Sequence, residues 1–217
     1  MNINSYIDHT LLKPEATEAQ IELAIRQAIE KHFYSVMVNP YWVAKVAQAL
    51  KETDVKTATV IGFPLGANTT SIKVAEAKQA IIDGADEIDM VMNIGELKAK
   101  NYEPVINDIA SVTQMAHHSN KIIKVIIETC LLTDDEIVKA STLVAQVGAD
   151  FVKTSTGFST SGATVKAVAL MSSAVKGTTT QVKAAGGIHS FENAKALIDA
   201  GATRLGVSHS LDIINNK

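Results

Sequence analysis

The sequence predicts an α/β fold, a single-domain (β/α)8 TIM barrel that occupies residues 1–217. Short apolar runs alternate strictly with longer segments of helical periodicity, which is typical of strands connected by helices. A glycine separates a helix-like segment from an apolar run at three places, Gly84, Gly148 and Gly201. The length of 217 residues suits one domain, because chains usually divide only beyond about 250–300 residues.

The repeated glycines indicate where helices end. Each is followed by alanine, a polar residue and then an apolar run. Glycine just past a helix avoids the Cβ clash at positive φ. The glycines are separated by about twice the length of one strand–helix unit, so an unmarked unit is expected between each pair. We therefore expect eight strands, at residues 5–10, 34–38, 56–61, 87–92, 122–128, 151–153, 181–184 and 204–207.

Helical patterns separate these strands, at residues 17–31, 42–51, 69–83, 103–117, 134–147, 164–175 and 191–200. Because each strand returns through a helix, neighbouring strands are expected to be parallel. The apolar run IIKVII fits a strand that is covered on both faces. Eight such units favour a closed barrel. An open doubly wound sheet is the alternative, but the first strand–helix turn lacks the G-x-G-x-x-G fingerprint of that fold.

Composition narrows the functional classes. The net charge of -3 argues against a general nucleic-acid binder, which would carry a basic surface. The first residues, MNINSYIDHT, do not form a secretory leader, and no run reaches the roughly 18 apolar residues of a membrane span. A single cysteine, Cys130, excludes an internal disulfide. We expect a cytoplasmic protein that binds neither nucleic acid nor membrane. No H-x-H or H-E-x-x-H spacing occurs, so neither a metal nor another cofactor is expected.

Two lysines in apolar strands are the main catalytic candidates. Lys153 and Lys183 follow apolar residues on neighbouring predicted strands, and the chemistry of such barrels lies at the carboxyl ends of the strands. Two ammonium groups facing one cavity oppose each other's protonation, and burial acts in the same direction, so one amine can be a nucleophile. The alternative is that each lysine only pairs with a carboxylate such as Asp89 or Glu128. Two lysines at adjacent strand ends favour catalysis.

Two further charged residues are expected in the barrel lumen. Asp89 alternates with Glu87 and Val91 on its strand, which allows it to point inward. It could orient a water and transfer protons, or it could simply compensate the lysine charge. Lys124 alternates in phase with Glu128, so the two are expected to share a face, either as a supporting ion pair or with Lys124 in a proton relay.

The loops after the last strands form a candidate anion site. Gly186 and Gly187 precede a helix that begins near Ser190, and glycine lets backbone N–H groups approach a ligand closely. Ser208 follows the eighth strand, and Gly157 follows the sixth. A simple turn is the alternative for a lone glycine pair. The position after strand seven, where such barrels commonly bind phosphate, favours the anion site.

Several motifs resemble one enzyme family over about Ile7 to Ser210. In chain order they are VIGFPLG, EIDMVMNIG, KVIIETCLLT, FVKTSTGF and VKAAGGI. Together they resemble the deoxyribose-phosphate aldolases. The resemblance implies a class I, metal-independent aldolase on a TIM barrel. Such an enzyme cleaves 2-deoxy-D-ribose 5-phosphate reversibly to acetaldehyde and D-glyceraldehyde 3-phosphate, so a sugar phosphate and an aldehyde are the expected partners. Relatives are often dimers, which makes a homodimer a possible assembly.

The resemblance also implies roles for individual residues. Lys153 would form the Schiff base, Lys183 would perturb its pKa and assist proton transfer, and Asp89 would act through water as acid and base. Lys124 is included with the catalytic residues. The residues expected to bind substrate or phosphate are Thr154, Thr156, Gly157, Gly186, Gly187 and Ser208.

Three positions depart from the family pattern. Met37 stands where relatives often have cysteine, and this substitution is expected to aid tolerance of aldehyde without removing activity. His209 stands where small residues are commoner, so it could crowd or supplement the phosphate site. The sequence ends in DIINNK, without the terminal tyrosine that many relatives use in proton transfer, which bears on turnover. Two competing hypotheses are a metal-dependent aldolase or isomerase and a noncatalytic sugar-phosphate binder.

Overall fold

The computed structural model describes residues 2–215 and shows a closed barrel of eight parallel strands in sequential order. Met1, Asn216 and Lys217 lie outside the described residues. The predicted domain boundaries and the last two residues of DIINNK fall on these positions. The strands are β1 (Ile7–Leu11), β2 (Ser35–Val38), β3 (Lys56–Ile61), β4 (Glu87–Val91), β5 (Ile122–Ile126), β6 (Phe151–Lys153), β7 (Gln181–Ala185) and β8 (Arg204–Val207). The predicted TIM-barrel fold is therefore confirmed.

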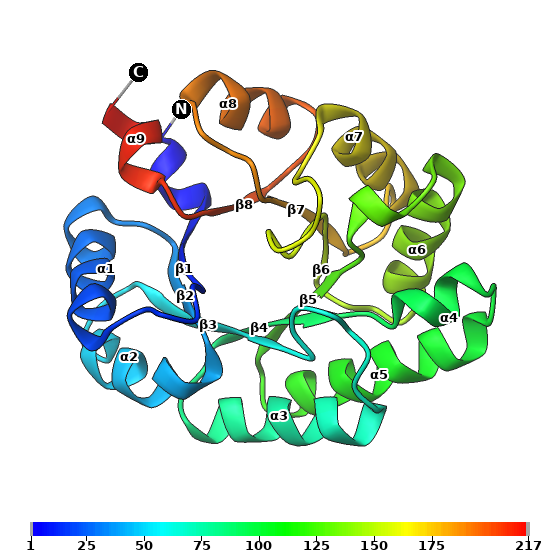
Figure 1. Cartoon of the computed structure of the whole chain (residues 1–217), viewed down its shortest axis with the longest axis horizontal. Coiled ribbons are helices and arrows are strands. Elements are labelled where there is room, and N and C mark those ends of the chain that lie inside the picture. Colours follow the sequence, from blue (N-terminus) through cyan, green and yellow to red (C-terminus); the bar gives the residue numbers. More distant parts are fainter. Residues whose placement is uncertain (1, 216–217) are drawn as a thin grey trace.

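Helices surround this barrel, as the ring of coiled ribbons in Figure 1 shows. They are α1 (Glu18–Lys31), α2 (Val43–Leu50), α3 (Thr70–Ile82), α4 (Ile94–Lys98), α5 (Tyr102–His118), α6 (Asp134–Gln146), α7 (Val165–Ala174), α8 (Phe191–Asp199) and α9 (Ser210–Asn215). Short 3-10 helices cover Ile3–Tyr6, Pro40–Trp42 and Thr129–Leu131. The short helices α4 and α9 were not predicted.

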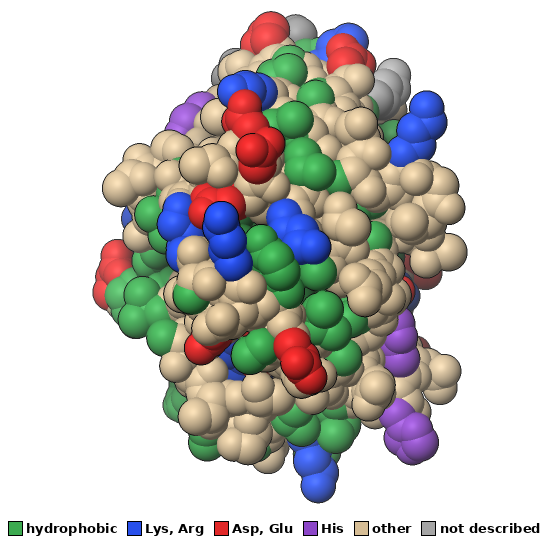
Figure 2. All heavy atoms as spheres, turned by 90° about the vertical axis from the view of Figure 1, so that its right-hand side faces the viewer, with side chains coloured by type: hydrophobic (Ala, Val, Ile, Leu, Met, Phe, Trp, Pro, Cys, Tyr) green, Lys and Arg blue, Asp and Glu red, His purple; other side chains and the backbone are tan. Residues whose placement is uncertain are grey.

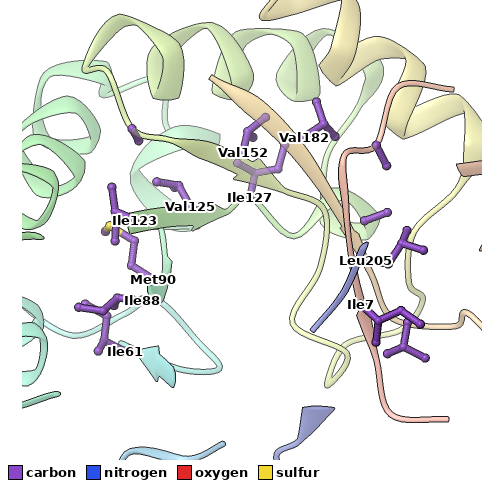
Figure 3. Close-up of a cluster of buried hydrophobic side chains, with 14 of the residues drawn as sticks. Ile7, Ile61, Ile88, Met90, Ile123, Val125, Ile127, Val152, Val182 and Leu205 are labelled. Carbon is purple, nitrogen blue, oxygen red and sulfur yellow. The ribbon is translucent and has the colours of Figure 1, made fainter. Parts of the chain in front are cut away.

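The two faces of the strands bury different kinds of side chain. Outward-facing residues form one large apolar layer with the helices, and Figure 3 shows part of it, including Val152 beside Val182. These two valines occupy paired positions on β6 and β7. Inside the barrel, a small apolar cluster contains Met37, Ala58 and Val60 from β2 and β3. The rest of the lumen is available to polar residues from the other strands.

The three glycines that follow helices have the predicted positive φ angles. Gly84, Gly148 and Gly201 have φ values of 103°, 75° and 115°, which favour glycine. At Gly201, an added Cβ would lie only 2.7 Å from the Cβ of Ser172 on α7. This position therefore combines a backbone requirement with a close approach between elements.

The outer surface is mixed in character. Figure 2 views the molecule from the right-hand side of Figure 1 and shows basic, acidic and hydrophobic side chains interspersed on that face. No helix among residues 2–215 has the length and apolar character needed to cross a membrane.

Candidate active site

Seven charged side chains meet inside the barrel, and all are buried. Their strand positions follow a two-residue period, which directs alternate side chains into the lumen. Arg204 Nη1 lies 2.9 Å from Asp8 and 2.8 Å from Glu87, so contacts cross the lumen as well as joining neighbouring strands. The group comprises Asp8 of β1, Glu87 and Asp89 of β4, Lys124 of β5, Lys153 of β6, Lys183 of β7 and Arg204 of β8.

Asp89 is the centre of the lysine contacts. Its Oδ2 atom lies 2.8 Å from the Nζ atoms of both Lys153 and Lys183. Its Oδ1 atom lies 2.7 Å from Lys124 Nζ. Burial alone would raise the pKa of Asp89, but the three ammonium groups hold it well below its ordinary value. The carboxylate is therefore ionised in the resting site, and its Oδ2 atom bridges two amines.

Two of these lysines have more than one carboxylate partner. Lys124 Nζ lies 2.6 Å from Glu87 as well as 2.7 Å from Asp89. Burial would lower the pKa of Lys124, but these carboxylates raise it above its ordinary value. Lys183 Nζ lies 2.5 Å from Asp8 in addition to its contact with Asp89. Lys124 therefore remains a cation, and Lys183 joins two carboxylates.

Lys153 is the least compensated cation of the group. Within the described chain its ion pairs involve a single carboxylate, Asp89, which it shares with two other lysines. Burial, together with the charges of Lys183 and Lys124, lowers the pKa of Lys153 to about 8, although Asp89 acts in the opposite direction. An amine with this pKa is partly neutral near pH 7.5, which is a requirement for nucleophilic attack.

The prediction that Lys124 and Glu128 share a face of their strand is wrong. Strand β5 ends at Ile126, and Glu128 adopts a left-handed conformation with φ of 54°. The turn separates Glu128 from the face of Lys124. The Glu128 carboxylate instead accepts hydrogen bonds from the backbone N–H of Thr156 at 3.2 Å and from the Thr156 hydroxyl at 2.5 Å. Glu128 thus fixes the loop after β6, and Lys124 pairs with Glu87 and Asp89.

The two threonines after Lys153 are engaged within the protein. Thr154 Oγ1 donates to the Ala185 carbonyl at 3.2 Å and accepts from the Ala185 N–H at 3.0 Å. Thr156 Oγ1 donates to Glu128 and accepts from the N–H of Phe158 at 3.0 Å. These bonds shape the loop that follows β6. Direct substrate contact through either hydroxyl remains a prediction.

The glycine loops predicted to bind an anion come together. A Cβ on Gly186 would lie 3.1 Å from the Cα of Gly162 and 3.5 Å from the Cα of Gly157. Gly157, Gly186 and Gly187 have φ values of 87°, 81° and 71°. Ser155 lies beside this convergence, because the same added Cβ would be 3.7 Å from its own Cβ.

Ser155 is a further candidate that the sequence did not single out. Its side chain is fully buried, and its Oγ atom has no hydrogen-bond partner within residues 2–215. A buried hydroxyl without a partner costs about 1–3 kcal/mol, so this hydroxyl is a candidate hydrogen-bond donor for a ligand. Ser208, in contrast, is exposed directly after β8, and its contact with a phosphate remains a prediction.

The loop after β6 turns inward over the barrel in Figure 1, where it is the yellow segment beside the β6 label. From this loop, Phe158 contacts Phe63 of the loop after β3, with ring centroids 5.3 Å apart in an edge-to-face arrangement. Lys153 is only 3 % exposed. The aromatic contact therefore joins the loops that follow β3 and β6.

Sequence reasoning assigned no role to three members of the charged group. Asp8 and Arg204 were not candidates, and Glu87 was considered only for its alternation with Asp89 on the strand. A two-residue period through each strand would have placed all three in the lumen. Among residues 2–215, no cluster of three or more His, Cys, Asp or Glu side chains has a metal-binding arrangement.

Together, the closed parallel barrel and the buried lysine centre define a (β/α)8-barrel enzyme. A model of the DeoC/LacD family aldolases matches residues 3–215. The chain belongs to this family and is an aldolase, a carbon–carbon lyase.

Individual relatives agree along nearly the whole chain. A deoxyribose-phosphate aldolase of Lactiplantibacillus plantarum is 65% identical over 214 residues, covering 99% of both chains. A deoxyribose-phosphate aldolase of Streptococcus suis is 57% identical over 215 residues, covering 99% of this chain and 96% of the relative. The tetrameric deoxyribose phosphate aldolase structure from Aeropyrum pernix superposes with a TM-score of 0.92 at 32% identity, covering 98% of this chain and 89% of that structure.

Proposed function

We propose that this aldolase cleaves 2-deoxy-D-ribose 5-phosphate reversibly through a Schiff base on Lys153. The observation that carries the proposal is the environment of this amine. Lys153 is buried, shares its single carboxylate with two other lysines, and has a pKa lowered to about 8. The names of the relatives from L. plantarum and S. suis support the choice of substrate.

The reaction begins when the neutral amine of Lys153 attacks C1 of the open-chain sugar and water leaves. The resulting iminium ion withdraws electrons from the C2–C3 bond. This is the bond that breaks, because acetaldehyde takes two carbons and D-glyceraldehyde 3-phosphate takes three. The C3 hydroxyl loses its proton as the C3 carbonyl forms, and the electron pair of the broken bond becomes the C1–C2 double bond of an enamine attached to Lys153. Protonation at C2 and hydrolysis then release acetaldehyde and restore the amine.

Proton movement is assigned to Asp89 and Lys183. Asp89 Oδ2 lies 2.8 Å from both Lys153 Nζ and Lys183 Nζ, so one atom can pass a proton between the two amines. A water held by Asp89 can serve the C3 hydroxyl and C2 in the same way. Lys124 is proposed to act by holding Asp89 in place, since it also pairs with Glu87.

The phosphate is assigned to the glycine loops at Gly157, Gly186 and Gly187, with Ser208 as a hydroxyl donor. Backbone N–H groups in such loops bind anions without a Cβ in the way. The Ser155 hydroxyl, which has no partner among the described residues, lies beside these loops and offers one more donor. Binding energy from the phosphate, remote from the reacting bond, would position C1 at the amine.

The deciding experiment is reductive trapping. The protein is incubated with 2-deoxyribose 5-phosphate or acetaldehyde and borohydride, and the reduced adduct is located by peptide mapping. A single adduct at Lys153 is expected, with none in Lys153→Arg, which keeps the charge but not a nucleophilic amine. An adduct at Lys183 would exchange the roles of the two lysines. Cleavage of the sugar phosphate without any adduct would refute the Schiff-base mechanism.

A further inference from the structure

Arg204 is the one member of the buried charged group to which the proposed reaction gives no role. It is the first residue of β8, whereas Lys153 is the last residue of β6. Only 5 % of Arg204 is exposed. Its guanidinium carbon lies 3.3 Å from the ring centroid of Tyr34, which precedes β2, and 5.2 Å from that of Phe151, which begins β6. The protein therefore holds Arg204 at the amino end of the strands, away from the loops assigned to the sugar phosphate.

The carboxylate partners of Arg204 are shared with lysines. Arg204 Nη1 lies 2.9 Å from Asp8 Oδ1 and 2.8 Å from Glu87 Oε2. The other oxygen of Asp8 lies 2.5 Å from Lys183 Nζ, and the same oxygen of Glu87 lies 2.6 Å from Lys124 Nζ. Two routes of direct contact therefore lead from the guanidinium to lysines that surround the reactive centre.

The positive charge of Arg204 is permanent. Burial opposes this charge, but Asp8 and Glu87 raise the pKa of Arg204 above its ordinary value, and a guanidinium does not lose its proton in proteins. Within the described chain, the three carboxylates and three lysines of the lumen would balance exactly one for one without it. With Arg204 present, one buried positive charge is in excess, which is costly. Because Arg204 cannot release a proton, a lysine has to do so.

We propose that Arg204 is a positioning residue that acts through Asp8 and Glu87, causes the lysine group to release one proton, and so keeps Lys153 nucleophilic. This inference rests on the proposed function, because it takes Lys153 as the reactive amine. The alternative is that Arg204 only connects β1, β4 and β8. The charged groups that act on Lys153 within the described chain are Asp89 of β4, Lys124 of β5 and Lys183 of β7.

The contacts set a limit on the distance between Arg204 and Lys153. Arg204 contacts Asp8, Asp8 contacts Lys183, and Lys183 shares one oxygen of Asp89 with Lys153. Along this path the two cations are at most about 13 Å apart, and a unit charge at that distance moves the titration of an amine by about one pH unit at an effective dielectric constant of about 20. The effect is large enough to measure.

The test follows the initial rate of borohydride trapping with acetaldehyde as a function of pH. Arg204→Met is expected to raise the midpoint of this profile by about one pH unit, so that trapping falls roughly eightfold at pH 7.5 and recovers at high pH. Arg204→Lys keeps a cation beside Asp8 and Glu87 and should keep the midpoint near that of the unaltered protein. Arg26→Met is the matched control, because it makes the same substitution at an exposed position of α1.

Glu87→Gln provides the opposite change. It removes one negative charge from the lumen and is expected to lower the midpoint. Combining it with Arg204→Met restores the excess of one positive charge, so the midpoint of the double variant should return towards that of the unaltered protein. A purely structural role predicts instead that the double variant is at least as impaired as either single variant. This comparison also tests the inference if Arg204→Met alone does not fold.

Two outcomes would overturn the inference. One is a midpoint in Arg204→Met within about 0.3 pH units of the unaltered protein, well below the change expected from the charge. The other is a double variant whose midpoint does not return. Either result would leave the Schiff base on Lys153 in place.

A second measurement separates this inference from the proposed function. Reductive methylation with formaldehyde, mapped to Lys153 as a function of pH, reports the neutral amine without any sugar phosphate. If this profile moves to higher pH in Arg204→Met but the unaltered protein does not cleave 2-deoxyribose 5-phosphate, the proposed function fails and the role of Arg204 stands. If the methylation profile does not move, the inference about Arg204 fails.

Discussion

Replacing Lys183 with methionine removes one cation beside Lys153 while keeping a side chain of similar length. The Lys153 and Lys183 Nζ atoms each lie 2.8 Å from the same Asp89 oxygen, so they are at most about 5.6 Å apart. At an effective dielectric constant of about 20, two unit charges at that distance repel by roughly 3 kcal/mol, equivalent to about two pH units of titration. Asp89 would also lose one of its three lysine partners, which acts in the same direction.

The substitution is therefore expected to raise the pKa of Lys153, which starts from about 8. Near pH 7.5, the neutral fraction of the amine would fall from about one quarter to below about 1 %. The assay is the initial rate of borohydride trapping with acetaldehyde as a function of pH. Trapping reports imine formation directly, so a separate role of Lys183 in proton transfer does not obscure the result.

Lys183→Arg is the matched control, because it keeps the cation and should leave the midpoint of the trapping profile nearly unchanged. The expected result for Lys183→Met is a midpoint about two pH units higher, with trapping recovered at high pH. A midpoint that stays near 8 in the methionine variant would show that the neighbouring charge does not tune the nucleophile. A loss of trapping at every pH would show that Lys183 acts on imine formation by another route.

Three further predictions concern activity and stability. Lys153→Ala is expected to abolish cleavage and trapping with an unchanged circular dichroism spectrum, because its carboxylate partner keeps two other lysines; appreciable residual cleavage would contradict the mechanism. Lys73→Met removes a fully buried ammonium that lies 2.5 Å from Asp108. Urea unfolding should show that the free energy of unfolding falls by about 3 kcal/mol. A fall below about 1 kcal/mol would mean that the buried pair contributes little to stability. Gly201→Ala should cost more stability than Gly148→Ala, since both have positive φ but only Gly201 has a close neighbour, and equal melting temperatures would refute that difference.

The strand order and most boundaries could be predicted because they depend on local patterns. The two-residue and helical periods, with glycine after three helices, locate the elements to within about two residues. The start of β1 was predicted two residues too early and the end of β5 two residues too late. The run KVIIETC remains apolar up to Ile127, and nothing in its composition indicates that Glu128 turns into the left-handed region.

The identity of the inward-facing residues could be predicted more readily than their partners. Period two places Asp89 and Lys124 in the lumen from each strand alone. Their pairing depends on how the strands are staggered, and the register aligns these two residues directly. The contact of Asp8 with Arg204 requires β1 and β8 to close the barrel, and no local pattern specifies which interior residues then meet. The hydrogen-bond partners of the Thr154 and Thr156 hydroxyls likewise depend on the conformation of the loop after β6, which no local pattern specifies.

The charges in the lumen explain why we propose Lys153 as the reactive amine. Within the described chain, the group has three carboxylates and four basic side chains, so one positive charge is in excess when all are ionised. Burial penalises that excess, and the least costly proton to lose is on the base with the weakest compensation. Lys124, Lys183 and Arg204 each contact at least two carboxylates, while Lys153 contacts a single shared one. Releasing the Lys153 proton brings the lumen to neutrality, so the same balance that permits burial of the group also favours Lys153 as the proposed nucleophile.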